Sequence, residues 1–256
     1  MIVIGILKKI IALVQKPFSL DGYIFFIGIT LAYLLINFND KFGYTFGFLA
    51  VFSIFFSKIA TGKYFPIEKD SIRFPDILWA IGGVAAYLLI ASLISVTFGA
   101  GDVSQVPRTI GSVLEKFGST IPAYQGSQIA TIFAFGFDVP FVESIFFTMA
   151  MFALAKWFSI DLTKLSIGSI GIITLTSYGF MQFHATARQI APGVFDTTAL
   201  LITFVFMFVS LFLLIVRGEK EVAPIIWMHI LVNVIALLVR FKNPVTMSVL
   251  ASLGVS

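Results

Sequence analysis

Each of the two histidines in the chain lies four residues from a second side chain that could share a site with it. Phe180 precedes His184, and Asn233 follows His229. Residues four positions apart project from the same face of a helix, so His229 and Asn233 should point into the same space. Imidazoles transfer protons near neutral pH, and amides donate hydrogen bonds to negative charge that develops during a reaction. The two pairs therefore favour a shared polar site between apolar helices.

A carboxylate in the preceding apolar segment could complete this site. Glu143 lies one helical turn after Pro140, among mainly apolar residues. Ionisable side chains inside such segments are costly and usually face a cavity or a partner. A carboxylate in a low-dielectric site is a useful base near neutral pH. We expect Glu143, the two histidines and Asn233 to line one polar pocket formed by three helices.

Neighbouring residues are expected to have structural roles. Asp138 is predicted to cap a helix start or to lie at an interface, because aspartate is a favourable N-cap residue. Gln182 lies on a different helical face from His184 and should make a packing or water contact. Gly136 is expected to permit a kink. Buried Glu, His and Asn side chains can also join membrane helices through hydrogen bonds, which is the alternative to a reactive site.

The elements that must position these residues are membrane helices. Of the 256 residues, 59% are hydrophobic and 12% are charged, and the mean hydropathy is +1.02. Average soluble domains are about half apolar and about a quarter charged. We therefore expect a single integral membrane domain over residues 1–256 with an all-α, polytopic transmembrane helix bundle, in contact with the lipid bilayer.

Charge and cysteine usage exclude several other classes. The net charge of +4 arises from 17 basic and 13 acidic residues scattered along the chain, with no basic run that could follow a phosphate backbone. This excludes nucleic-acid binding. The absence of cysteine excludes disulfides, thiolate catalysis and cysteine-based zinc sites.

About seven spanning helices, within a range of six to eight, are predicted from the roughly 20 apolar residues needed to cross a bilayer. The fourth contains Pro140 and is expected to be kinked or split. Residues 1–18 carry three lysines within an apolar stretch, which indicates an amphipathic helix at the interface. A short surface helix is expected from Val106 to Phe117. The seven spans are 20–37, 43–57, 77–98, 128–156, 166–187, 198–216 and 222–240.

The distribution of loop cations favours a cytoplasmic N-terminus. With seven spans, 11 of the 17 Lys and Arg residues lie on the N-terminal side of the membrane and 6 on the other side. Cytoplasmic loops are enriched in these residues. The preference for Ile, Phe and Lys over Arg indicates a prokaryotic cell membrane.

The three polar segments resemble the signature of the CPBP family, which comprises the membrane-embedded CAAX proteases and the bacteriocin-processing (Abi) proteins. The family motifs are EExxxR, FxxxH and HxxxN, on separate transmembrane helices. Phe180 with His184 matches the second motif, and His229 with Asn233 matches the third. In the first motif, Glu143 matches the first glutamate, whereas Ser144 and Thr148 replace the second glutamate and the arginine. The resemblance covers residues 128–240.

The resemblance implies a glutamate-dependent intramembrane endopeptidase that uses no metal and no other cofactor. Glu143 and His184 would hold a water, with Glu143 as the general base, and His229 and Asn233 would donate hydrogen bonds to the oxyanion. Phe180 would belong to the substrate-binding part of the site. Arg188, one turn after His184, could join it and restore a positive charge near Glu143. The implied substrate is a hydrophobic or lipidated peptide.

Three alternatives stay open. A non-catalytic member of the family would keep the pocket and bind a peptide, a lipid or a partner protein, as in self-immunity against a bacteriocin. Two histidines and one glutamate are also a known catalytic zinc set, although the sequence lacks an HExxH motif. A transporter is the third alternative, but the chain has no internal repeat that would support alternating access.

Overall fold

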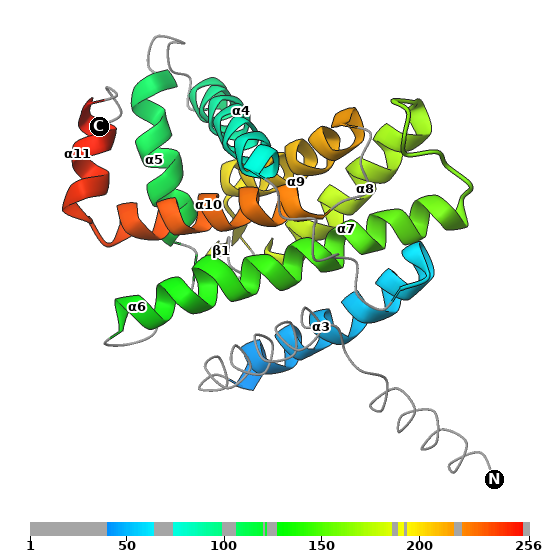
Figure 1. The fold of residues 1–256 in the computed structure, drawn as a ribbon. Coiled ribbons are helices and arrows are strands. Elements are labelled where there is room, and N and C mark those ends of the chain that lie inside the picture. The colour runs from blue at the N-terminus through cyan, green and yellow to red at the C-terminus, as the bar shows by residue number, and fades with distance from the viewer. Residues whose placement is uncertain are drawn as a thin grey trace.

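The computed structural model describes residues 40–63, 74–98, 106–119, 121, 127–185, 189–191, 194–217 and 222–252. The described part is helical apart from two short strands (Figure 1). The elements in chain order are α3 Asp40–Thr61, α4 Phe74–Phe98, α5 Val106–Ser119, α6 Gln128–Thr131, the π-helix η2 Ile132–Asp138, α7 Val139–Trp157, α8 Ile167–Phe183, β1 Gln189–Ala191, β2 Val194–Phe195, α9 Thr197–Arg217, α10 Ala223–Arg240 and α11 Pro244–Ser252.

Four helical segments in the described part are long and apolar enough to cross a membrane, and they are compatible with an integral membrane protein. They are Pro75–Phe98, Gln128–Trp157, Thr197–Arg217 and Ala223–Arg240. These correspond to the expected spans 77–98, 128–156, 198–216 and 222–240.

The expected number of about seven spans is not confirmed. Helix α8, over the expected span 166–187, has only 17 residues. In α3, over the expected span 43–57, the part whose side chains are described contains the apolar stretch Leu49–Thr61. The expected span 20–37 and the interfacial helix 1–18 lie outside the described residues.

Helix α10 is the element around which the candidate site is built. It packs against α4, α5, η2 and α7, while α3 lies along α7 and α8 packs against α9 (Figure 1). Its inward residues include Val232, Ala236 and Leu237, none of which has measurable exposure. This packing brings the segment after Ala223 against the segment after Gln128, although they are far apart in the sequence.

The short surface helix expected at 106–117 is present as α5, but it is packed into the bundle rather than only lying on its surface. Val113, Leu114 and Phe117 are buried on its apolar face. Gly118 allows the end of α5 to approach α10, because a Cβ atom there would overlap the carbonyl oxygen of Ala236. The Arg240 guanidinium donates to the carbonyl of Gly118 at 3.1 Å, so α10 also caps the end of α5.

The segment around Pro140 is one long helix rather than a split pair. Segments α6, η2 and α7 follow one another without a break from Gln128 to Trp157 (Figure 1). Proline lacks an amide hydrogen and cannot bond to the preceding turn. The chain accommodates this with the π-helix before Pro140, where the Val139 amide bonds to the carbonyl of Ala134, five residues earlier.

Candidate functional site

The carboxylate of Glu143 lies between the two imidazole rings. Its Oε1 atom is 3.5 Å from Nε2 of His184, and its Oε2 atom is 3.7 Å from Nε2 of His229. Helices α7, α8 and α10 therefore bring together the three ionisable groups expected to share a pocket. Both contacts are longer than an ordinary hydrogen bond.

The exposure of these side chains decreases steadily from one end of the group to the other. The side chain of His184 is 21% exposed and that of Glu143 is 6% exposed. The side chain of His229 is 2% exposed, and Ser144 is fully buried. Among these residues, the carboxylate is therefore least covered on the side of His184.

His184 is held at the end of α8 by the carbonyl of Phe180. That carbonyl accepts the backbone amide of His184 at 3.2 Å and lies 2.9 Å from Nδ1 of its ring. The two rings also contact each other, with centroids 4.3 Å apart. The FxxxH spacing thus has a physical role, because Phe180 orients the imidazole through both its carbonyl and its ring.

His229 is enclosed by aromatic rings and one hydroxyl. The ring centroid of Phe206 is 4.8 Å away, and Phe180 makes an edge contact at 5.8 Å. The Oγ atom of Ser144 lies 3.1 Å from Nδ1 of His229. The apolar surroundings lower the local dielectric, which strengthens the interaction of this imidazole with nearby charge.

Asn233 lies one turn after His229 on α10 but makes its contact elsewhere. Its Nδ2 atom donates to the carbonyl of Phe135 in the π-helix at 2.8 Å. Its Oδ1 atom is buried and has no hydrogen-bond partner among the described residues. The amide nitrogen keeps a second hydrogen, so Asn233 can still donate to another acceptor.

The two departures from the family motif are both buried and neutral. Ser144 and Thr148 have no measurable exposure. Ser144 contacts His229, whereas Oγ1 of Thr148 has no hydrogen-bond partner in the described part of the chain. Arg188, expected to supply a positive charge near Glu143, lies outside the described residues.

Three neighbouring residues have the following positions. Gln182 is exposed, in agreement with its expected place away from the His184 face. Asp138 makes no capping hydrogen bond, because it lies inside the continuous helix, where the preceding turn already satisfies the amides. Gly136 does not mark a break; it is buried and lies close to α10, where a Cβ atom would be 3.0 Å from Val234.

Three contacts in the site are not predicted by the sequence patterns. These are the Ser144 contact, the Phe206 ring and the Phe135 carbonyl. Comparison with the family motif treats Ser144 only as the replacement of a glutamate. Its position next to Glu143 also indicates that its hydroxyl could contact the site. No pattern in the sequence distinguishes Phe206 from the other 29 phenylalanines.

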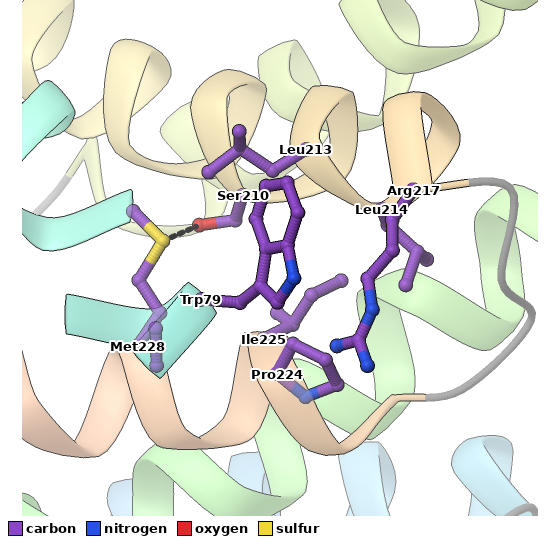
Figure 2. A pocket seen from close by; sticks show the side chains of 9 residues that line it. Trp79, Ser210, Leu213, Leu214, Arg217, Pro224, Ile225 and Met228 are labelled. Carbon is purple, nitrogen blue, oxygen red and sulfur yellow. Dashed lines mark hydrogen bonds between the residues drawn. The ribbon is translucent and has the colours of Figure 1, made fainter. Parts of the chain in front are cut away.

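A surface pocket lies on a different side of α10 and does not include the Glu143 group. It has a volume of about 280 Å³, including its open part, and Trp79, Leu213 and Met228 are among its lining residues. Figure 2 shows Trp79 in the middle of this set, with the Ser210 hydroxyl bonded to the Met228 sulfur at 3.3 Å. Arg217 lines the same pocket and pairs with the buried Asp76 at 2.5 Å.

Within the described ranges, no group of three or more His, Cys, Asp and Glu side chains is arranged to hold a metal ion.

Comparison with known proteins adds no family assignment. No protein-family model matches the chain, and no curated protein or solved structure matches it either. Functional inference therefore rests on the motif residues and their geometry.

Proposed function

We propose that this protein is a glutamate-dependent intramembrane endopeptidase of the CPBP type. The observation that carries the proposal is the position of the Glu143 carboxylate between the Nε2 atoms of His184 and His229. Two histidines selected by their spacing meet a carboxylate selected by its apolar surroundings, and the three residues come from separate helices. An acid–base pair that is partly accessible at one end is the minimum needed to activate a water.

The proposed reaction uses Glu143 as the general base. A water held by Glu143 and His184 attacks the scissile carbonyl carbon while one of its protons passes to the carboxylate. A C–O bond forms, and the carbonyl electrons move to oxygen to give a tetrahedral oxyanion. When the C–N bond breaks, the proton leaves Glu143 for the departing amine. The products are a carboxylic acid and an amine, and Glu143 is regenerated.

His229 and Asn233 are assigned to the oxyanion. A donor of this kind contributes about 2.7–4 kcal/mol to transition-state stabilisation in enzymes in which it has been removed. The enclosure of His229 by Phe180 and Phe206 supports this role, because water is excluded and the donor is held in place. The second amide hydrogen of Asn233 is available for the same purpose.

The substrate proposed is a hydrophobic or lipidated peptide. The apolar helices around the site favour a substrate whose lipid or apolar side chains stay in the bilayer while the scissile bond reaches His184. We further assign the protein to a prokaryotic cell membrane with a cytoplasmic N-terminus. In this proposal, α8 is embedded in the membrane along with the four long apolar segments, because it carries His184.

A cleavage assay in proteoliposomes tests this function. Quenched fluorescent peptides, prenylated and unprenylated, are incubated with wild-type protein and with Glu143→Gln, His184→Ala and His229→Ala. Loss of cleavage in all three variants is the expected result. Gln182→Ala is the matched control, because Gln182 is exposed on the same helix as His184 and its variant should keep wild-type activity. Cleavage that survives in Glu143→Gln would disprove the proposed mechanism.

A non-catalytic, peptide- or lipid-binding role is the second candidate, and the neutral residues at 144 and 148 favour it. Family members with the full signature have a glutamate and an arginine there, and this chain has Ser144 and Thr148. This candidate predicts that folded wild-type protein binds the peptides of the panel without cleaving them. Activity that a chelator abolishes would instead support a zinc site.

A further inference from the structure

The hydrogen-bonding partner of His184 determines which of its ring nitrogens carries the proton. A carbonyl oxygen can only accept a hydrogen bond, so the contact with Phe180 requires a hydrogen on Nδ1 of His184. In the neutral ring, Nε2 then has a lone pair, and this atom faces Oε1 of Glu143. This side of the carboxylate is therefore ready to receive a proton or a water that donates to both groups.

The partner of His229 differs, because a hydroxyl can donate as well as accept. If Nδ1 of His229 donated to Ser144, Nε2 would present a lone pair to Oε2 of Glu143, and the carboxylate would face lone pairs from both rings. If the Ser144 hydroxyl donates to Nδ1, Nε2 carries the hydrogen and faces Oε2 as a donor. The second arrangement is favoured because it replaces a repulsion with an attraction inside a buried site.

We propose that Ser144 is a positioning residue that holds His229 in the tautomer with hydrogen on Nε2. The two imidazoles then have opposite tautomers and different roles toward one carboxylate. Without a substrate, the single Nε2 hydrogen of His229 faces Oε2, and it can be given to an oxyanion when a substrate is bound, whereas His184 leaves Oε1 as the basic oxygen. The catalytic part of this inference rests on the proposed function, but the tautomer itself does not.

The surroundings of His229 give Ser144 this influence. The rings of Phe180 and Phe206 contact the imidazole and provide no strong acceptor or donor. Ser144 is fully buried, so bulk water does not compete for the hydroxyl at that position. A carboxylate at position 144 could only accept while ionised, and it would draw the hydrogen to Nδ1. A serine at position 144 therefore changes which ring nitrogen of His229 carries the hydrogen, in addition to removing a negative charge.

Nitrogen NMR of the histidine rings tests the tautomers directly. Because the chain contains only two histidines, protein labelled with ¹⁵N-histidine gives two ring systems, which His184→Gln and His229→Gln assign. The spectra are recorded at about pH 8, above the usual imidazole pKa of about 6.5. The wild type should show hydrogen on Nε2 of His229 and on Nδ1 of His184. Hydrogen on Nδ1 of His229 would overturn the proposal without the use of any variant.

Variants at position 144 give the second test. Ser144→Ala should shift the His229 nitrogens toward a mixture of tautomers and leave His184 unchanged, whereas Ser144→Thr should restore the wild-type signals. Ser177→Ala is the matched control, because Ser177 is equally buried and has no hydrogen-bond partner for its hydroxyl among the described residues. Unchanged His229 signals in Ser144→Ala would contradict the proposal.

The same variants separate this inference from the proposed peptidase. In the cleavage assay, Ser144→Ala should lower kcat about 10- to 100-fold, the usual effect of removing an outer partner of a functional histidine, with little change in KM. Expected tautomers without any wild-type cleavage would leave the role of Ser144 intact and remove the peptidase. Full activity and unchanged tautomers in Ser144→Ala would support the peptidase and contradict the proposed role of Ser144.

Discussion

Asn233 donates a hydrogen bond to the backbone carbonyl of Phe135, which lies 98 residues earlier in the chain. Two amides could normally bond to that carbonyl along the helix. The amide of Val139 bonds instead to Ala134, and Pro140, the next residue, has no amide hydrogen. The proline and the π-helix therefore leave an acceptor available to the Asn233 side chain. The side chain of Asn233 is thus held by the backbone of the segment that precedes Glu143.

This relationship predicts that Asn233 and Pro140 are energetically coupled. Asn233→Ala should lower the free energy of unfolding by about 1–3 kcal/mol, because it removes the hydrogen bond that Asn233 donates to the buried Phe135 carbonyl. In a Pro140→Ala background, an amide at 140 can bond to the helix carbonyls, and the same change should cost less. A double-mutant cycle of unfolding in detergent measures the coupling. Strict additivity of the two changes would contradict it.

Gly118 should be intolerant of a side chain. Gly118→Ala would place a Cβ atom on the carbonyl of Ala236, and separating α5 from α10 should cost about 1–3 kcal/mol, the usual range for overpacking. Gly171→Ala is the matched control, since a Cβ atom there meets nothing within 4 Å. That variant should be neutral or stabilising by up to about 1 kcal/mol through helix propensity. Thermal unfolding that ranks the two variants in the opposite order would exclude this packing role.

A carboxylate in an apolar segment and two histidines in i,i+4 pairs were sufficient to predict that Glu143, His184 and His229 lie together. The same spacing grouped Asn233 with His229, but Asn233 donates to the carbonyl of Phe135. The partner of each group was not predictable by the same means. The Phe135 acceptor depends on a π-helical register, and the Ser144 contact depends on how α7 and α10 pack. Neither leaves a periodic signal in the sequence.

The number of spans was hard to predict, because an apolar segment can be a membrane span or a shorter helix that is buried against other helices. A 17-residue helix such as α8 has the composition of a span without its usual length. Packing between helices also requires apolar side chains, since 67% of α10 is buried inside the protein. Apolar composition alone does not distinguish a surface that faces lipid from one that faces another helix.

The ion pair between Asp76 and Arg217 should stabilise the protein only as a pair. Asp76 is fully buried, and the two side chains meet at 2.5 Å. Arg217→Met removes the positive charge that pairs with the buried carboxylate and should cost about 3–5 kcal/mol, whereas the double variant Asp76→Asn, Arg217→Met should recover most of that loss. Unfolding in detergent gives both values. Peptidase activity of the folded double variant should match the wild type, because Arg217 lines a pocket that does not include Glu143.

The pairing of Asp196 with Lys116 predicts a loss of stability in acid. Partial burial raises the pKa of the Asp196 carboxyl, but the hydrogen bond from Lys116, the Ala199 amide and the positive charge of Lys116 outweigh it, so the pKa lies below its ordinary value of 3.8. The Lys116 and Asp196 side chains are 2.6 Å apart, and the Asp196 carboxylate caps the start of α9 by accepting a hydrogen bond from the Ala199 amide at 3.0 Å.

A carboxyl group whose pKa is lowered in the folded state contributes stability that is fully present above its unfolded pKa. That contribution is lost as the pH falls from about 4 through the lower, folded pKa. Asp196→Asn should therefore be less stable than the wild type at neutral pH, and the difference should shrink toward pH values below about 3. Lys116→Met should reduce the same acid dependence, because it removes the largest of the interactions that lower the pKa. Melting temperatures of the three proteins measured across this range test the linkage, and a constant difference between wild type and Asp196→Asn would contradict it.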